Sequence, residues 1–326
     1  MNEVTVIIPA YNAERTVGRA VRSVLASTVP VDVVVVDDGS SDATAAAAEK
    51  AAAECAAERG SSFRLVRQAN AGAYTARVRA LAGVETPYFA FVDADDAVEP
   101  SMYERLLAFS RANDLDIAQC DAVGAACAAV PQELFLGEAQ VREKVVLPRL
   151  LRGEGAVSVW DKVYRNRLGG AGFEPSDIMM FEDLAINLQL FVGAERVGYL
   201  HEGLYRYDVN PGSSVRNFRL KNVSDLREAI RFRKKFLPRL AGGDCDGGVM
   251  AAWVVRNVRN MYLVACSAPV RDGVSRMEKV RALLDLPEVE KAFAELGISF
   301  RRRVMRTRAA VAFAFAAKRL KALTGE

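Results

Sequence analysis

The chain has 326 residues, 51% of them hydrophobic, and a formal net charge of +3 at pH 7. This length suits one large domain with an appendage, and the apolar side chains suffice for a sizeable core. The small charge excess argues against a dedicated nucleic-acid-binding protein, since such proteins usually carry a strong basic excess. Five scattered cysteines without a CxxC pair argue against a disulfide framework and a zinc site, so we expect free thiols.

The first hundred residues alternate apolar runs with helical patterns. Four short segments predict strands, at residues 4–8, 33–36, 63–66 and 88–92, and the first, a continuous apolar run, is typical of a buried parallel strand. Helical patterns separate these runs, at residues 17–25, 43–57 and 73–82. This alternation indicates an α/β fold with a mostly parallel central sheet flanked by helices.

The pattern changes along the rest of the chain. A weaker strand, a helix and a Tyr-rich strand are predicted at residues 115–119, 139–151 and 199–207. From about residue 215, Arg- and Lys-rich helical patterns run to the end of the sequence. We therefore predict a boundary near residues 214–218, which divides an α/β domain (1–216) from a helical C-terminal domain (217–326).

Three polar clusters follow directly on predicted strands: PAYN at 9–12, DDGSSD at 37–42 and DADD at 93–96. In parallel sheets ligands bind at the carboxyl ends of the strands, where these clusters would converge. The carboxylates of Asp93, Asp95 and Asp96 would repel one another unless a cation such as Mg²⁺ or Mn²⁺ joined them. The alternative is that these acids only cap a helix that begins near Glu99.

Two further features accompany the DADD cluster. Asp37 and Asp38, followed by Gly39, suit hydrogen bonding to a base or ribose, although ordinary turn chemistry explains them equally. Arg77 lies about two turns into the third predicted helix. It could reach phosphate oxygens or hold carboxylates, and the alternative is a solvated helix charge.

The general base is predicted to be a carboxylate. His201 is the only histidine, so a Ser-His-Asp or Cys-His arrangement would depend on it, and nothing near it resembles one. Glu182 and Asp183 precede an apolar helical pattern. They are either a general base and its neighbour or acids that complement the helix macrodipole.

These motifs resemble those of family 2 glycosyltransferases of the GT-A fold. The resemblance rests on VTVIIPAYNAERTV, VVVVDDGSSDAT, NAGAYTARVRAL and YFAFVDADDAVEP in this order. Further on, VWDKVYRNRL, FEDLAINLQLF and LYRYDVNPGSSV are similar to acceptor-side and closing motifs of the capsule and cell-surface polysaccharide branch. The resemblance covers residues 1 to about 216 and implies a nucleotide-sugar-binding half (about 1–100) and an acceptor half (about 101–216).

The resemblance also implies roles for individual residues. The implied donor-binding residues are Pro9, Tyr11, Asp38, Arg77 and Asp93, and the implied ligands of Mg²⁺ or Mn²⁺ are Asp93 and Asp95. The implied general base is Asp183, supported by Glu182, and the implied acceptor-binding residues are Trp160, Lys162 and Asp96.

The implied activity is an inverting, metal-assisted transfer of one sugar from a nucleotide-diphosphate sugar, UDP-linked, to a hydroxyl of a cell-surface glycan or lipid-linked acceptor. The QxxRW motif of processive synthases is missing, which favours transfer of a single sugar. Asp208 stands where the family often has an arginine, and Arg206 lies two residues earlier. The resemblance therefore does not assign the residue that would clamp the diphosphate.

Two basic stretches, 231–236 and 301–308, suggest contact with an anionic membrane surface or solvated helix faces packed against the catalytic domain. No signal peptide or spanning segment is evident, so we expect a cytoplasmic protein, peripheral at the inner face of the plasma membrane. Two rival functions are a nucleotidyltransferase and an inactive GT-A-like binding module. PAYNAER in place of a Gly-rich basic loop argues against the first, and retention of Asp93, Asp95 and Asp183 against the second.

Overall fold

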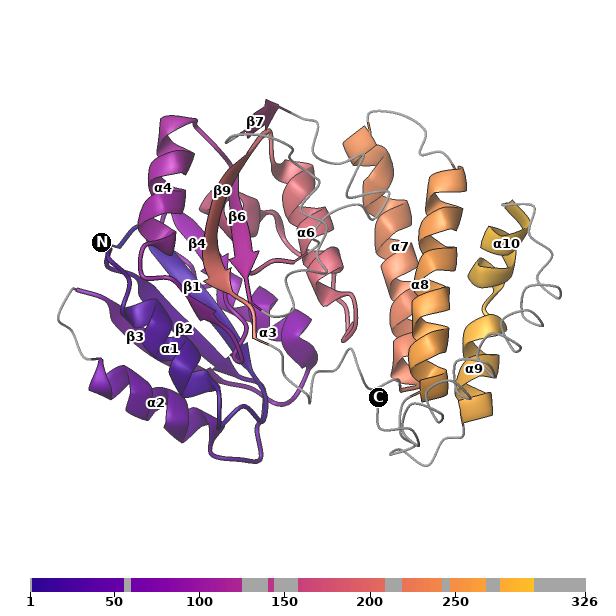
Figure 1. Cartoon of the computed structure of the whole chain (residues 1–326), viewed down its shortest axis with the longest axis horizontal. Helices are drawn as coiled ribbons and strands as arrows, with labels where there is room; N and C mark the ends of the chain where they lie inside the picture. The colour runs from indigo at the N-terminus through magenta and orange to yellow at the C-terminus, as the bar shows by residue number, and fades with distance from the viewer. Residues whose placement is uncertain are drawn as a thin grey trace, which may run out of the picture. The chain divides into compact units, whose positions relative to one another are not determined.

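The computed structural model describes residues 2–55, 60–124, 140–143, 158–208, 219–241, 247–267 and 276–295 (Figure 1). The chain divides into two compact units. The larger comprises residues 1–210 and 231–242, and the smaller comprises residues 211–230 and 243–326. The boundary predicted near residues 214–218 lies outside the described residues and stays a prediction.

The larger unit contains a nine-stranded sheet with the order β3-β2-β1-β4-β8-β6-β9-β5, in which β7 also pairs with β9. The strands are β1 (Val4–Ala10), β2 (Asp32–Asp37), β3 (Ser62–Arg67), β4 (Tyr88–Phe91), β5 (Ala97–Val98), β6 (Ile117–Val123), β7 (Gln140–Glu143), β8 (Lys162–Arg165) and β9 (Arg196–Arg206).

The sheet has a parallel half and a mixed half. Strands β3, β2, β1 and β4 are parallel, as the apolar runs predicted. Strand β8 runs antiparallel to both β4 and β6, β6 runs parallel to β9, and β5 and β7 pair antiparallel with β9. The mixed α/β sheet flanked by helices therefore agrees with the predicted class. Its four N-terminal strands are all parallel, whereas the other half combines antiparallel pairs with the parallel pair β6–β9.

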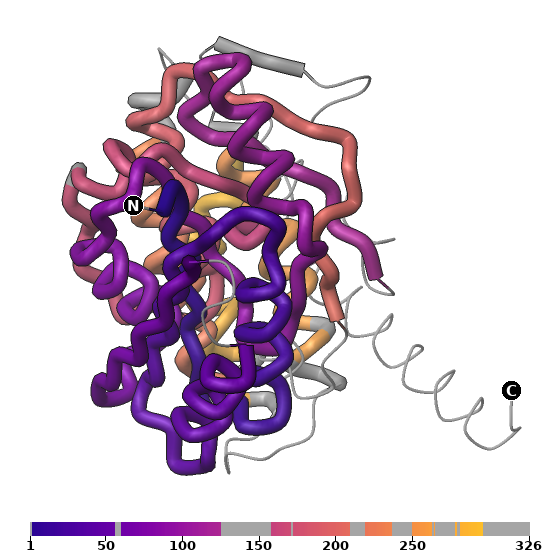
Figure 2. Tube along the Cα trace, turned by 90° about the vertical axis from the view of Figure 1, so that its left-hand side faces the viewer, coloured from indigo at the N-terminus to yellow at the C-terminus, as the bar shows by residue number. Residues whose placement is uncertain are grey.

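Helices cover both faces of this sheet (Figures 1 and 2). They are α1 (Val17–Leu25), α2 (Thr44–Glu54), α3 (Gly72–Leu81), α4 (Met102–Ala112), the 3-10 helix η2 (Asn166–Ala171) and α6 (Glu182–Gly193). Alternate residues of β1 and β2, such as Val6 and Val33, share one core with buried side chains of α1, α2 and α4. Phe91 points to the opposite face, where it meets Tyr164 and the Arg77 guanidinium of α3.

The helix predicted over residues 139–151 is wrong at its start, where residues 140–143 form β7 on the edge of β9. Pairing with β9 satisfies the backbone of this segment, and such tertiary contacts override helix propensity. The rest of the predicted helix lies outside the described residues.

The smaller unit is helical in its described part. It holds the first part of α7 (Lys221–Ala241), then α8 (Gly247–Ser267), α9 (Arg276–Leu284) and α10 (Pro287–Glu295). Val254, Val258 and Phe293 are buried where α8 and α10 contact each other. Among the described residues, no helix is both long and apolar enough to cross a membrane.

Candidate functional site

Asp38 lies at the carboxyl end of β2 and is almost fully buried. One carboxylate oxygen accepts hydrogen bonds from Gln68 Nε2 at 2.7 Å and the Ala71 amide at 2.8 Å, and the other accepts from the Gly72 amide at 2.8 Å. Gly72 has a φ of +88°, a conformation that favours glycine, and it begins α3. The carboxylate of Asp38 therefore fixes the start of α3, and its predicted contact with a base stays a prediction.

Tyr11 and Pro9 lie at the end of β1 but differ in exposure. Pro9 is a buried strand residue in register with Val36. Tyr11 is 53% exposed, just before Asn12, whose φ is +48° and whose side-chain oxygen accepts the Ser41 amide at 2.9 Å. The turn thus leaves the ring of Tyr11 open to solvent, where a base could stack on it.

Arg77 joins the two acidic motifs. Its side chain on α3 is 2% exposed, so it is not a solvated helix charge. Nη2 lies 2.6 Å from Asp93 Oδ1, and Nη1 lies 3.1 Å from Asp183 Oδ1 and 3.7 Å from Glu182 Oε1. One buried guanidinium therefore serves three carboxylates that come from two distant parts of the sequence.

Burial and mutual repulsion shift the pKa values of this cluster. Burial would lower the pKa of Arg77, but Asp183, Asp93 and Glu182 outweigh it and raise that pKa. Burial raises the pKa of Asp93 to about 6 despite the opposing effect of Arg77. Burial and the charge of Asp183 raise the pKa of Glu182 to about 8, and burial also raises the pKa of Asp183. The cluster thus holds more negative charge than one arginine neutralises, so a proton or a further cation is favoured.

Asp93, Asp95 and Asp96 follow β4, and each offers a carboxylate oxygen within 4.8 Å of the others. These are hard oxygen ligands, which fit Mg²⁺ or Mn²⁺. The alternative that they cap a helix is wrong, because α4 begins only at Met102 and has Ser101 at its N-cap.

Both carboxylate oxygens of Asp96 accept hydrogen bonds from the protein. Oδ2 accepts the Tyr205 hydroxyl at 2.7 Å, and Oδ1 accepts the Asp208 amide at 2.9 Å. Burial, and next the charge of Asp93, raise the pKa of Asp96 to about 8. Its carboxyl group is therefore used within the protein, and its predicted acceptor role stays a prediction.

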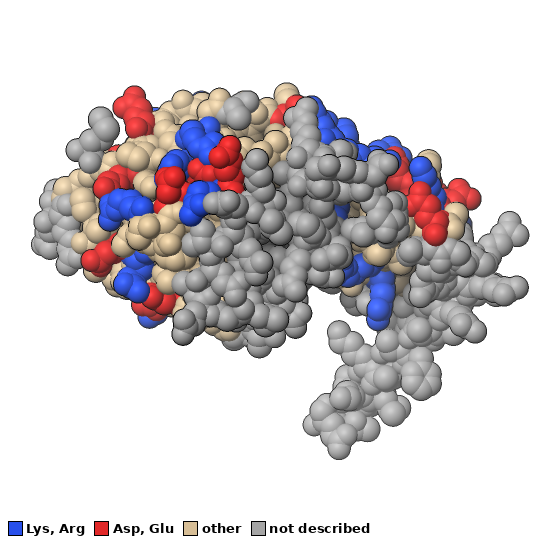
Figure 3. Space-filling view, turned by 90° about the horizontal axis from the view of Figure 1, so that it is seen from above, with Lys and Arg blue, Asp and Glu red and all other residues tan. Residues whose placement is uncertain are grey.

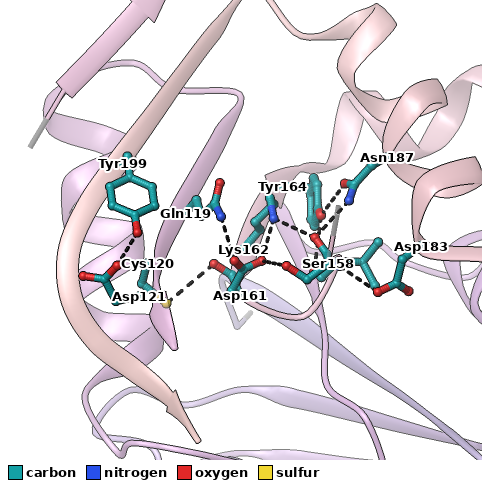
Figure 4. Close-up of polar contacts among 11 residues, drawn as sticks. Gln119, Cys120, Asp121, Ser158, Asp161, Lys162, Tyr164, Asp183, Asn187 and Tyr199 are labelled. Carbon is teal, nitrogen blue, oxygen red and sulfur yellow. Dashed lines mark hydrogen bonds and ion pairs between the residues drawn. The ribbon is translucent and has the colours of Figure 1, made fainter. Parts of the chain in front are cut away.

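The two other predicted acceptor residues lie on the mixed half of the sheet. Trp160 is 8% exposed and stacks on Tyr205 and Tyr207, with ring centroids 4.2 and 5.5 Å apart. Lys162 is 1% exposed, and its ammonium donates to the Ser158 carbonyl at 2.6 Å and to Asp161 Oδ1 at 2.5 Å (Figure 4). Lys162 thus belongs to a buried network, and lining of an acceptor pocket stays a prediction.

The same network supports Asp183 (Figure 4). Asp183 Oδ2 accepts the Val159 amide at 3.3 Å. The neighbouring Ser158 carbonyl is also bonded by Asn187 Nδ2 at 2.9 Å. Phe181, just before α6, has a φ of +70°, which is uncommon for a non-glycine residue and concentrates at functional sites. The hydrogen-bonded segment Ser158–Val159 and the strained backbone of Phe181 therefore set the direction of the Asp183 side chain.

Several contacting residues were not predicted from the sequence. Tyr205 reaches both Asp93 and Asp96, although in the sequence it is only one tyrosine of a Tyr-rich strand. Arg19 of α1 bonds the Asp95 carbonyl and the Asp208 carboxylate. Asp208, which stands where the family often has an arginine, therefore pairs with Arg19.

The remaining basic and histidine candidates lie outside this cluster. Arg206 pairs with Glu99. His201 Nδ1 lies 3.6 Å from Asp121 Oδ2, and neither residue belongs to the metal-type cluster found among the described residues.

The basic stretch 231–236 is used inside the larger unit. Arg231 and Lys235 pair with Glu174, and Arg233 is fully buried. In the view of Figure 3, Lys and Arg side chains alternate with Asp and Glu over the described atoms. The stretch 301–308 lies outside the described residues, so the membrane prediction depends on it.

Comparisons with known proteins agree with the motifs. The family described as "Glycosyl transferase family 2" matches residues 5–135. The chain is 32% identical to glycosyltransferase EpsJ of Bacillus subtilis (strain 168), over 64% of this chain and 62% of EpsJ. It is also 32% identical to glycosyltransferase YibD of Escherichia coli (strain K12), over 72% of this chain and 70% of YibD. The chain thus spans less than two thirds of EpsJ.

Solved structures give the same fold. Residues 1–349 of S. aureus TarS superpose with a TM-score of 0.62 at 20% identity, covering 89% of this chain and 80% of that one. Mannosyltransferase PcManGT from Pyrobaculum calidifontis, in complex with GDP-Man and Mn²⁺, has a TM-score of 0.55 at 16% identity, covering 98% and 87%. At these identities the likeness establishes the GT-A fold.

Proposed function

The chain belongs to glycosyltransferase family 2, and on that premise we propose that it moves one sugar from a UDP-linked donor to a hydroxyl of a cell-surface glycan or lipid-linked acceptor, with inversion. The observation that carries this proposal is the shared contact of Arg77 with Asp93 at 2.6 Å and Asp183 at 3.1 Å. Asp93 on the proposed donor side and the proposed base Asp183 thus contact the same guanidinium. They are therefore close together, and a direct displacement needs donor and base close together.

The donor nucleoside is proposed to lie against the exposed ring of Tyr11, beside the turn that Asp38 fixes. Pro9 would shape the strand end under the base. Complexes of TarS with UDP-GlcNAc and with UDP support a UDP-linked donor. PcManGT was crystallised with GDP-Man, so the nucleobase is the first property of the donor to test.

Asp93 and Asp95 would hold Mg²⁺ or Mn²⁺, because both are hard oxygen ligands in a cluster with excess negative charge. When bound, the cation supplies positive charge beside the departing nucleoside diphosphate. Arg77 adds a fixed positive charge on the same side and orients the Asp93 carboxylate.

Asp183 is the proposed general base. Its carboxylate removes the proton of the acceptor hydroxyl while that oxygen attacks the anomeric carbon, and the nucleoside diphosphate leaves from the opposite face. A single displacement inverts the configuration. Burial and the charge of Asp183 raise the pKa of Glu182 to about 8, which favours a protonated Glu182 beside Asp183 at neutral pH.

The acceptor is proposed to approach Trp160. Lys162 and Asp96 would support this site indirectly, Lys162 by its bond to the Ser158 carbonyl and Asp96 by its bond to the Asp208 amide. Residues 217–326 are proposed to form a helical C-terminal domain that contacts an anionic membrane through residues 301–308. Changing the five arginines of that stretch to glutamine should release the protein from anionic liposomes, and unchanged co-sedimentation would contradict this proposal.

The activity is tested by incubating the full chain with UDP-glucose, UDP-galactose, UDP-GlcNAc or GDP-mannose, with and without Mn²⁺. We expect slow, Mn²⁺-dependent release of nucleoside diphosphate from one UDP-sugar, abolished by Asp95→Ala. Release from none of them would favour the binding module. Synthesis of a nucleotide sugar from a nucleoside triphosphate and a sugar phosphate would favour the nucleotidyltransferase.

A further inference from the structure

Tyr205 makes two contacts with the DADD segment that the proposed mechanism does not use. The residue lies on β9 and is fully buried. Its hydroxyl donates to Asp96 Oδ2 at 2.7 Å and accepts the Asp93 amide at 3.2 Å. A single side-chain oxygen therefore holds both the backbone of one acid and the carboxyl group of another.

The segment between β4 and β5 is consequently fixed at several points. The side chain of Asp93 is held by Arg77 and its amide by Tyr205. Asp96 is bonded by the Tyr205 hydroxyl and by the Asp208 amide. These contacts leave the acids in one arrangement, in which the oxygens of Asp93, Asp95 and Asp96 lie within 4.8 Å of one another.

The ring of Tyr205 is itself positioned by Trp160. The two rings stack with centroids 4.2 Å apart and planes inclined by 22°. Trp160 also stacks on Tyr207 at 5.5 Å, so it is held from a second side. A change in the position of Trp160 would therefore move the Tyr205 hydroxyl and, with it, the Asp93 amide.

We propose that Tyr205 is a positioning residue that presents Asp93 and Asp95 to the divalent cation and links their arrangement to Trp160. This inference rests on the proposed cation site. Hydrogen-bond partners of metal ligands orient those ligands, and their loss commonly weakens metal binding. Tyr205 fills this role from a strand that is more than 100 residues away in the sequence.

The test is the affinity of the full chain for Mn²⁺, measured by electron paramagnetic resonance of the free ion at a fixed concentration of UDP. Tyr205→Phe should weaken Mn²⁺ binding by about tenfold or more. The matched control is Tyr103→Phe, which should bind as the wild type does. Tyr103 is also fully buried, but its hydroxyl has no hydrogen-bond partner in the part of the chain that the structure describes.

A second pair of variants tests the link through the ring and remains informative if Tyr205→Phe folds poorly. Trp160→Leu removes the stacking surface and should also weaken Mn²⁺ binding. Trp160→Phe keeps an aromatic face and should restore most of the affinity. Thermal unfolding without Mn²⁺ checks that each variant is folded.

The outcomes separate this inference from the function on which it rests. If Asp95→Ala binds Mn²⁺ as well as the wild type does, the proposed cation site fails. If Asp95→Ala loses Mn²⁺ while folded Tyr205→Phe stays within about twofold of the wild type, the role of Tyr205 is overturned. Equal affinities of Trp160→Leu and Trp160→Phe would overturn the link to Trp160.

Discussion

The parallel and mixed halves of the sheet place their candidate site residues in different ways. In the parallel half, Tyr11 and Asp38 follow directly on the end of a strand, and Asp93 lies two residues after the end of β4. In the mixed half, Asp183 and Tyr205 reach the cluster through contacts with Arg77 and Asp96, which lie about a hundred residues away. The proposed donor side thus depends on local backbone and the proposed base on long-range packing. A substitution should act locally in the first and across the unit in the second.

The largest expected effect tests the base on the mixed half. Asp183→Asn should lower the rate of nucleoside-diphosphate release by about 10²- to 10⁴-fold, because the amide cannot take the acceptor proton. Donor affinity, measured by titration calorimetry, should change little. The control is Asp114→Asn, an exposed carboxylate paired with Arg165, which should keep full activity. A rate within tenfold of the wild type would remove Asp183 from the mechanism.

The second prediction tests Arg77, the residue that joins the two halves. Arg77→Met should lower the free energy of unfolding by about 3 kcal/mol at pH 8, since it leaves three partly buried carboxylates without their buried cation. The loss should shrink at pH 5, because Asp93 and Glu182, with pKa values of about 6 and 8, then hold protons. Urea unfolding measures both values. Arg79→Met on the exposed face of the same helix should change stability by less than about 0.5 kcal/mol.

The third prediction compares a glycine from each half. Gly39 has a φ of +73°, and a Cβ there would lie 2.7 Å from the Asn70 amide nitrogen. Gly39→Ala should therefore cost about 1–3 kcal/mol in the free energy of unfolding. Gly170 of η2 would meet nothing within 4 Å, and Gly170→Ala should be neutral. Equal stability of the two variants would contradict the expectation that the backbone at Gly39 requires a glycine.

The smallest expected effect is the change in the free energy of unfolding with pH that Asp96 causes. Its folded pKa of about 8 lies above the ordinary value of 3.8, so the folded state keeps a proton that the unfolded state has lost. Stability from this group therefore falls as pH rises from about 4 to about 8. The free energy of unfolding of Asp96→Asn, relative to that of the wild type, should therefore rise by about 1 kcal/mol between pH 6 and pH 7. Asp114→Asn, whose parent pKa is lowered chiefly by Arg165, should show no such trend.

Features that depend on neighbouring residues could be predicted from the sequence. Strands β1, β2 and β4 of the parallel half hold short apolar runs that end in polar clusters, and the structure places them as predicted. Strand β3 also lies where it was predicted, although Arg64 interrupts its apolar residues and its side chains are at most partly buried. The acidic cluster after β4 was predicted for the same reason, since its three members are neighbours in the chain.

Features that depend on pairing between distant segments could not be predicted. The resemblance implies that Lys162 binds the acceptor, and nothing in the sequence shows that its ammonium bonds the Ser158 carbonyl and Asp161 in a buried network. Tyr205 looks like any other strand tyrosine until β9 pairs with β5 and brings it to Asp96. Residues 140–143 begin a segment that the sequence predicts as a helix, and pairing with β9 makes them a strand instead.

The hydrogen bonds of Asp38 have a consequence for anion binding. A helix N-terminus attracts phosphate through its free amide groups and the positive end of the helix dipole. At the start of α3 the buried carboxylate of Asp38 already occupies the amides of Ala71 and Gly72 and supplies the negative charge. Asp38 therefore competes with a phosphate for this helix end, and a diphosphate bound as proposed would depend more on side-chain cations and on an ion held by the neighbouring aspartates.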